Sequence, residues 1–347
     1  MNSGYLDNNL LANKNKKNYE KVWVLLDSKK GHKNQAIAVA NKLKLKYKLI
    51  DIKYTALSVL PNFLLELLGG VFHVKKSIRK KLNDPFPKII IACGRRTAPI
   101  AKWIKKTNQG NSFHAQIMWP GMGFFSNSNI DIIATPEHDR IFPRKNILYT
   151  QGVPHEINKN LLEKGKKDWN NQLKDLPSPR IAVLIGGNTK HGSFNSKMLK
   201  NLLEECIKMA EPNGSLMITS SRRTDEKLNK YMDNIIKKSG LKYFLWHDNK
   251  NYNEKKNPYI ALLAYADFIV VTGDSISMLS EACSVAKPVY IFSTKSIYSK
   301  KHILFHKTLI KNKHASLLGK EISESFSFKT INDSDKVAKK IIEMIKN

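Results

Sequence analysis

The stretch Val-Trp-Val-Leu-Leu-Asp-Ser-Lys-Lys-Gly-His, residues 22–32, joins an apolar run to a short polar turn that carries a glycine, and a helical pattern follows. The same order recurs at the turns 94–97, 186–192, 220–224 and 272–277. In an open parallel sheet, turns at the carboxyl ends of the strands line the ligand crevice, and helix N-termini there favour anions. Because the five turns fall into two clusters, we expect an α/β protein with two Rossmann-like parallel-sheet domains that face each other across a cleft.

The alternation of strand and helix patterns predicts where these domains begin and end. It runs over 21–152, pauses in a segment with three prolines, and restarts at Arg180. The first 20 residues are rich in Asn and Lys and indicate a disordered tail, not a signal peptide. The predicted division is therefore 1–20 tail, 21–152 N-terminal domain, 153–179 linker, 180–330 C-terminal domain and 331–347 C-terminal helix.

Composition narrows the class of protein. The chain has no apolar run of 18 or more residues, so no membrane-spanning helix is expected. Its three cysteines (Cys93, Cys206 and Cys283) are widely spaced and form no metal-ligand pattern. A reduced, cytoplasmic compartment is the simplest interpretation, and neither a metal nor a cofactor is expected.

The net charge of +30, from 59 Lys and Arg against 29 Asp and Glu, has two interpretations. It can reflect an anionic lipid or a phosphate-bearing substrate, or A/T-rich coding that favours Lys. No nucleic-acid-binding motif accompanies it, so nucleic acid is an unlikely partner. Only eight of the 59 are Arg, and half of these form the pairs Arg95-Arg96 and Arg222-Arg223 after expected strands. The planar guanidinium binds phosphate or carboxylate through two hydrogen bonds, so these pairs favour anion binding; a salt bridge at a helix start is the alternative.

The segment Pro61–Leu82 combines an apolar stretch with a basic one. Such a segment can lie in a membrane interface, where anionic headgroups attract the cations. Peripheral contact with the inner face of the membrane, through Phe63–Lys81, is therefore one expectation. A single helix over 62–82 that packs on its own sheet, with a solvated basic end, is the other.

The polar turns of the expected C-terminal domain suit a nucleotide-sugar. Gly273 allows a tight turn from strand to helix, and Glu281 lies where a carboxylate can accept both hydroxyl groups of a ribose. Three glycines within 186–192 let backbone N–H groups converge on an anion. The layout resembles the donor site of GT-B glycosyltransferases; a plain capped helix and a flexible turn are the structural alternatives. The predicted donor-side residues are Gly186, Gly187, Asn188, Lys190, Arg222, Asp274, Ser275, Ser277 and Glu281.

The polar turns of the expected N-terminal domain suit an acceptor. A histidine at a helix start that faces the crevice can act as general base toward an acceptor hydroxyl, so His32 is the candidate catalytic residue. It could equally hydrogen-bond its own turn, and the cluster at 136–139 could be purely structural. The predicted acceptor-side residues are Asp27, Gly31, Gln35, Arg95, His138 and Asp139.

Together these turns resemble the bacterial branch of the elongated-mitochondria (mitochondrial fission) protein family. The matching stretches are 23–35, 94–98, 136–139, 185–187, 272–282 and 305–309. The chain departs from the usual pattern at Met118–Phe125, where Trp119-Pro120-Gly121 replaces an Asp-Pro-Arg-like turn. The resemblance implies a GT-B-like fold. Plant members of the family are linked to the recruitment of a dynamin-type protein to mitochondria. For a bacterial member, the resemblance implies a role in cell-envelope sugar chemistry.

Three functions remain open at this point. The first is a GT-B-type glycosyltransferase that moves a sugar from a nucleotide-sugar to a cell-envelope or lipid-linked acceptor. The second is a non-catalytic adaptor of the same fold that binds a protein or a membrane. The third is a sugar-nucleotide epimerase, which needs no acceptor.

Overall fold

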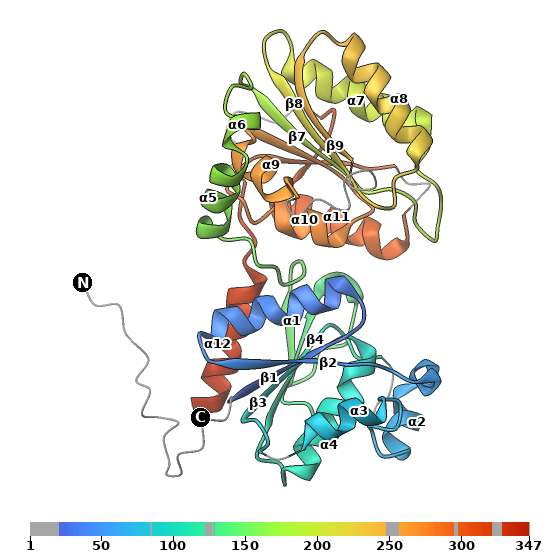
Figure 1. The fold of residues 1–347 in the computed structure, drawn as a ribbon, viewed down its shortest axis with the longest axis vertical. Helices are drawn as coiled ribbons and strands as arrows, with labels where there is room; N and C mark the ends of the chain where they lie inside the picture. Colours follow the sequence, from blue (N-terminus) through green and yellow to red (C-terminus); the bar gives the residue numbers. More distant parts are fainter. Residues whose placement is uncertain are drawn as a thin grey trace, which may run out of the picture.

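The computed structural model describes residues 21–83, 85–121, 127, 129–247, 257–294, 298–320 and 328–346. The predicted tail at 1–20 lies outside the described residues. So do residues 122–125 of the stretch Met118–Phe125, where the sequence differs from the usual family pattern. Two six-stranded sheets, one above the other in Figure 1, each carry helices on both faces. The prediction of two parallel-sheet α/β domains is therefore confirmed.

The first sheet has the order β2-β1-β3-β4-β5-β6, and every neighbouring pair is parallel. Its order reverses between β1 and β3, which in open α/β sheets marks the point where ligands bind. Every residue of β1 and β3 is buried, which explains their continuous apolar sequences. The strands are β1 (Val22–Leu26), β2 (Tyr47–Asp51), β3 (Ile89–Cys93), β4 (Phe113–Ile117), β5 (Ile132–Pro136) and β6 (Ile147–Thr150). The helices of this part are α1 (Lys30–Leu43), α2 (Asn62–Leu67), α3 (Lys76–Arg79) and α4 (Ala98–Thr107), with short 3-10 turns at Ala56–Val59, Lys80–Leu82, Arg95–Thr97 and Glu137–Asp139.

The second sheet has the order β12-β11-β10-β7-β8-β9, also parallel throughout, and reverses between β7 and β10. Its strands are β7 (Arg180–Ile185), β8 (Ser215–Ser220), β9 (Lys242–His247), β10 (Phe268–Thr272), β11 (Val289–Phe292) and β12 (Ser316–Leu317). Its helices are α7 (Ser196–Ala210), α8 (Glu226–Lys238), α9 (Tyr259–Tyr265), α10 (Ile276–Ala282) and α11 (Lys300–Lys311). The sequence did not predict β12, because a two-residue strand has no measurable alternation.

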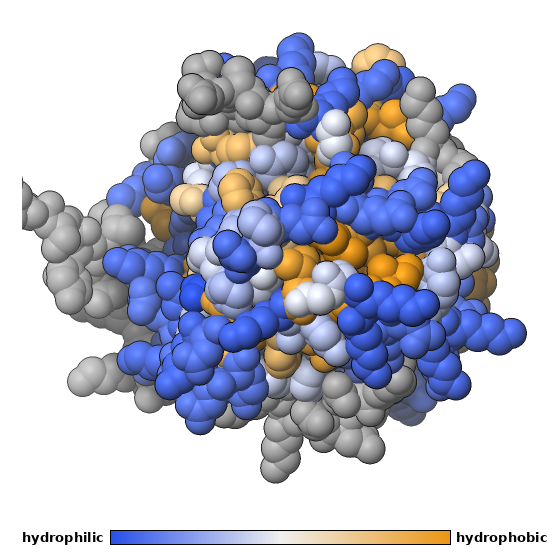
Figure 2. Space-filling view, turned by 90° about the horizontal axis from the view of Figure 1, so that it is seen from above, coloured by the Kyte–Doolittle hydropathy of each residue, from blue (hydrophilic) through white to orange (hydrophobic). Residues whose placement is uncertain are grey.

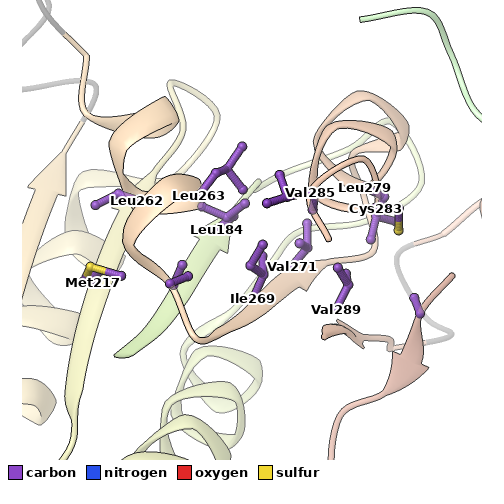
Figure 3. Close-up of a cluster of buried hydrophobic side chains, with 14 of the residues drawn as sticks. Leu184, Met217, Leu262, Leu263, Ile269, Val271, Leu279, Cys283, Val285 and Val289 are labelled. Carbon is purple, nitrogen blue, oxygen red and sulfur yellow. The ribbon is translucent and has the colours of Figure 1, made fainter. Parts of the chain in front are cut away.

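One of the two core clusters of the second domain fills the space between its sheet and the helices α9 and α10 (Figure 3). Leu184 of β7 and Val271 of β10 meet Leu263 of α9 and Leu279 of α10, all fully buried. This packing holds the start of α10, and therefore the residues that follow β10, in one position relative to the sheet.

Between β6 and β7 in the sequence, within the expected linker, come α5 (Lys159–Asp168) and α6 (Asn170–Leu173), which pack beside α9 of the second domain (Figure 1). The chain crosses between domains a second time, because α12 (Asp333–Lys346) returns to pack on α1 (Figure 1). Hydrogen bonds join the two crossings. The Asp333 carboxylate accepts them from the backbone N–H groups of Gln151 and Gly152, at 3.2 and 2.7 Å. The last helix therefore belongs to the core of the first domain.

The prediction of one helix over 62–82 is wrong. The segment contains α2, a turn, α3 and a 3-10 turn. Gly69 and Gly70 have φ of +88 and +75, which end α2, and a Cβ on Gly70 would lie 2.9 Å from the carbonyl oxygen of Pro99. Two adjacent left-handed residues cannot continue a right-handed helix.

The surface is strongly polar where the second domain forms the end of the molecule. In Figure 2, which looks onto that end, hydrophilic side chains cover most of the face and hydrophobic ones show only in the hollows between them. Among the described residues, no helix is long and apolar enough to cross a membrane.

Candidate active site

The switch point of the first sheet brings together a carboxylate, an imidazole and a guanidinium. Asp27 follows β1, His32 lies in the first turn of α1, and Arg96 follows β3. Asp27 Oδ2 lies 2.6 Å from Nδ1 of His32, and Asp27 Oδ1 accepts a hydrogen bond from Nη2 of Arg96 at 2.7 Å. Since the carboxyl ends of β1 and β3 are adjacent, the fold itself makes this cluster.

Gly94 allows the cluster to close. It has φ of +83, and a Cβ at this position would lie 2.5 Å from Nδ1 of His32. A residue with a side chain would therefore be strained in its backbone and would displace the imidazole.

The charge state of Asp27 sets the tautomer of His32. Burial by itself raises the pKa of the Asp27 carboxyl, but the hydrogen bond from His32, the Arg96 charge and the Ser28 N–H together lower it to about 2. The carboxylate is thus ionised at neutral pH and can only accept hydrogen bonds. Nδ1 of His32 therefore carries a proton, and the tautomer that this contact selects has its lone pair on Nε2.

This cluster lines a pocket of about 230 Å³, together with Lys29, Ser58, Val59 and Arg95. The Arg95 guanidinium donates to the carbonyl oxygens of Ser58 (2.7 Å) and Leu60 and to the side chain of Asn62 (3.3 Å). Arg95 was predicted on the acceptor side; its observed contacts tie the segment 58–62 to the wall of the pocket.

In the second domain, a buried carboxylate ties three turns together. Asp274 Oδ2 accepts from the N–H of Gly187 at 3.1 Å and from Nη2 of Arg223 at 2.6 Å, and Oδ1 accepts from the Thr272 hydroxyl at 2.6 Å. A Cβ on Gly186 would lie 2.0 Å from Asp274 Oδ2. Asp274 therefore positions the glycine turn and the arginine turn, and its side chain is fully covered.

Between the domains lies a cleft of about 620 Å³. Its walls hold Glu281, Ser277 and Ser275 of the second domain opposite Lys30 and Asn34 of α1. Ser277 and Glu281 are four residues apart on α10 and so share one face of that helix. Arg222 and Arg223 line the same cleft after β8.

Glu281 is held by a tyrosine. The Tyr259 hydroxyl donates to Oε2 of Glu281 at 2.6 Å. Burial raises the pKa of Glu281. The Tyr259 hydrogen bond opposes this rise, and the nearby Glu156 charge adds to it. One carboxylate oxygen is thus anchored, and the other remains for a ligand in the cleft.

The structure brings only some of the predicted residues together. Arg222, Ser275, Ser277, Glu281 and Gly31 line the main cleft. Gln35 lies in an adjoining cavity of about 240 Å³ that also contacts Gly31 and Glu281. The glycine turn and the loop after it do not line the cleft: Asn188 Oδ1 accepts from the Phe194 N–H at 2.9 Å, and Lys190 is exposed.

His138 and Asp139 lie apart from His32, in a crevice against α11. The sequence missed Tyr259 and Asn34, which line the cleft from helices whose periodicity predicted only packing. Within the described residues, no three His, Cys, Asp or Glu side chains converge in a way that could hold a metal ion.

Two facing Rossmann-like domains, a cleft between their switch points, and a last helix that returns to the first domain define a protein of GT-B-like fold. A family model described as "Mitochondrial fission ELM1" matches residues 30–345, and the chain belongs to this family.

Two relatives and two solved structures illustrate the similarity. An uncharacterized protein of Rickettsia prowazekii (strain Madrid E) is 32% identical over 94% of this chain and 97% of its own length. The mitochondrial fission protein ELM1 of Arabidopsis thaliana is 30% identical over 76% of this chain and 65% of its own length. The Arabidopsis thaliana UGT89C1 complexed with UDP-L-rhamnose has a TM-score of 0.50 at 10% identity, with 93% of this chain and 89% of that chain covered. The S. aureus MnaA–UDP structure has a TM-score of 0.48 at 12% identity, with 94% and 96% covered.

Proposed function

We propose that the protein is a glycosyltransferase of the GT-B type, which moves a sugar from a nucleotide-sugar to a hydroxyl group of a cell-envelope or lipid-linked acceptor. Two observations carry the proposal. The Asp27–His32 pair lines a pocket at the ends of β1 and β3, and Lys30 and Gly31, just before His32 in the chain, line the cleft whose other wall holds Glu281. A nucleotide-sugar donor agrees with the structure of similar fold that is complexed with UDP-L-rhamnose.

On the donor side, each residue has a role that its chemistry suits. The free oxygen of Glu281 accepts the ribose hydroxyl groups, while Tyr259 holds the other oxygen. Arg222 neutralises the diphosphate with a guanidinium group that can bind two oxygens at once, while Asp274 holds the guanidinium of Arg223 next to it in the chain. Ser275 and Ser277 add hydroxyl donors at the same wall.

On the acceptor side, His32 acts as general base. Nε2 takes the proton of the acceptor hydroxyl as that oxygen forms its bond to the anomeric carbon of the sugar. The bond between this carbon and the donor diphosphate breaks, and the departing diphosphate carries the electron pair. Asp27 stabilises the imidazolium that forms, so that the pair contributes a factor on the order of 10²–10⁴ in rate.

The first test is a thermal-shift panel with UDP, GDP, CMP and their sugars, run on the wild type and on Glu281→Ala. We expect one nucleotide to raise the Tm of the wild type but not that of the variant, because a ligand that binds only the folded state stabilises it. His32→Ala serves as the matched variant: it should keep the nucleotide-induced shift and lose turnover of the nucleotide-sugar. A wild type that no nucleotide stabilises would contradict the proposal.

A membrane-binding adaptor is the second candidate, and one surface favours it. We call residues 56–72 the apolar arm, because six large hydrophobic side chains there are 42–82% exposed: Leu57, Val59, Phe63, Leu67, Leu68 and Phe72. Exposed cations follow at Lys75, Lys76, Lys80 and Lys81. Apolar insertion next to lysines suits an anionic membrane, each lysine contributing about 1 kcal/mol. Peripheral attachment to the inner face of the membrane is compatible with either function.

Vesicle sedimentation tests the apolar arm. The wild type should bind vesicles that contain phosphatidylglycerol more strongly than pure phosphatidylcholine, and Phe63→Ser/Leu67→Ser should lose this binding. Phe142→Ser is the control, because Phe142 is 83% exposed but lies outside the arm. Equal binding by all three proteins would rule out the arm as the contact.

The epimerase hypothesis uses the same donor site. It predicts that the nucleotide-sugar is converted when no acceptor is present, whereas a transferase leaves its donor sugar unchanged apart from slow hydrolysis. Product analysis without acceptor separates the two.

A further inference from the structure

Another cavity, of about 680 Å³, lies between the domains at the carboxyl ends of β4 and β5. Met118, Trp119 and the 3-10 turn Glu137–Asp139 form one wall, and the first two turns of α11 form the other. It shares no lining residue with the main cleft. Nothing in the proposed donor or base chemistry uses this crevice.

The crevice is cationic. Lys300, Lys301 and Lys307 of α11 and Arg140 of the first domain line it, against one carboxylate, Asp139. Asp139 forms an ion pair with Lys301. Among the residues that the structure describes, no other carboxylate lines the crevice, so Lys300, Lys307 and Arg140 favour an anionic ligand there.

The same crevice has an apolar component. Met118, Trp119, Ile303 and Leu304 contribute hydrophobic side chains to its walls. A small inorganic anion would leave these side chains unused, whereas a ligand with hydrocarbon next to its charge would cover them.

His138 lies in the wall of this crevice, and its ring nitrogens make no hydrogen bond. Its side chain is 3% exposed, and neither Nδ1 nor Nε2 has a hydrogen-bond partner. Its ring packs on Phe305, with the centroids 4.6 Å apart. Burial, partly opposed by Asp139, lowers the pKa of His138 to about 4, so the ring is neutral and has one N–H to donate. Buried polar groups in native proteins are normally paired, so an unpaired one in a cavity wall points to a ligand.

We propose that this crevice binds a ligand in which a phosphate group adjoins a hydrocarbon chain, with the phosphate between Lys300, Lys307 and His138 and the hydrocarbon on Trp119 and Leu304. Binding itself does not require the proposed glycosyl transfer.

Calorimetric titration without nucleotide tests the proposal, with three probes: farnesyl phosphate below its micelle concentration, inorganic phosphate, and farnesol. We expect farnesyl phosphate to bind at least tenfold more tightly than either of the others, since they each supply half of its chemistry. Equal affinity for farnesyl phosphate and inorganic phosphate would overturn the proposal, as would no binding of farnesyl phosphate.

Charge reversal locates the site. Lys300→Glu/Lys307→Glu should weaken farnesyl phosphate binding at least tenfold. The matched control is Lys200→Glu/Lys208→Glu on α7, which makes the same change of net charge on exposed side chains. Equal loss of affinity in both double variants would show a general charge effect and contradict the site.

His138→Phe separates a ligand contact from a packing role. The variant keeps an aromatic ring on Phe305 and removes two unpaired buried nitrogens, so the free protein should have a Tm equal to or above that of the wild type. Its farnesyl phosphate affinity should fall at least tenfold. Unchanged affinity would show that His138 takes no part in binding and would overturn its assignment.

Discussion

Asp27 and His32 lie five residues apart, and their side chains meet at 2.6 Å over the backbone of Gly94. The contact exists because β1 ends at Leu26 and α1 begins at Lys30, so the turn folds the histidine back over the end of the neighbouring strand β3. An ionised carboxylate on Nδ1 both orients the imidazole and keeps the lone pair on Nε2.

Asp27→Asn should therefore slow sugar transfer by about 10²–10⁴, because the neutral amide no longer fixes the tautomer or stabilises the imidazolium. Nucleotide affinity should be unchanged, since Asp27 does not line the main cleft. Asp51→Asn is the control: Asp51 ends the next strand, β2, and its side chain is 54% exposed. A variant Asp27→Asn with wild-type turnover would remove His32 from the mechanism.

The same carboxylate predicts acid sensitivity. The folded-state pKa of Asp27 lies at about 2, below the ordinary value of 3.8. A lowered pKa contributes stability above pH 4, which is lost as the pH falls from about 4 to 2, and its full size is about 2 kcal/mol. Urea unfolding should show the wild type more stable than Asp27→Asn at pH 6. The difference in unfolding free energy between the two proteins should decrease toward pH 3. A difference that stays constant would contradict the pKa shift.

Gly94→Ala should displace His32. Gly110→Ala is a matched control, because both glycines have φ of +83 but a Cβ on Gly110 meets nothing within 4 Å. Both variants carry the cost of an alanine at positive φ, roughly 1–3 kcal/mol. Only Gly94→Ala adds the collision with the imidazole. We expect a lower Tm and a loss of turnover in Gly94→Ala beyond the small loss of stability in Gly110→Ala; equal Tm values in the two would argue against the close contact.

Tyr259→Phe should weaken nucleotide binding by about three- to tenfold, which corresponds to the net contribution of roughly one typical hydrogen bond. The reason is that Glu281 loses the donor that holds it in the cleft wall. Tyr265→Phe on the same helix removes a surface hydrogen bond to Asn170 instead and should bind nucleotide normally. Titration of both variants with the nucleotide found in the thermal-shift panel decides the matter, and identical affinities would exclude the holding role.

The sequence predicted the elements closely because buried parallel strands are continuous apolar runs with glycine-bearing turns after them. It failed at 62–82, where the apolar period continued across Gly69 and Gly70 although their positive φ ends the helix. The sequence also placed His138 with His32 on the acceptor side. Position along the chain placed both after strands, but only the sheet order shows that β5 lies three places from β1.

The sequence by itself determined the fold class and the five turns, because hydrophobic period and turn residues are local properties of the chain. Tertiary structure decided what each polar residue does there. Asp274 and Arg95 sit in the predicted turns, yet their charged groups hold other turns in place, because neighbouring strands bring partners from distant sequence within reach. His32, in a predicted turn, and Glu281, in the helix after another, lie in cavity walls. Sheet order and domain packing decide whether a side chain in a turn bonds to another part of the protein or lies free to bind a ligand. A local sequence pattern contains no information on either.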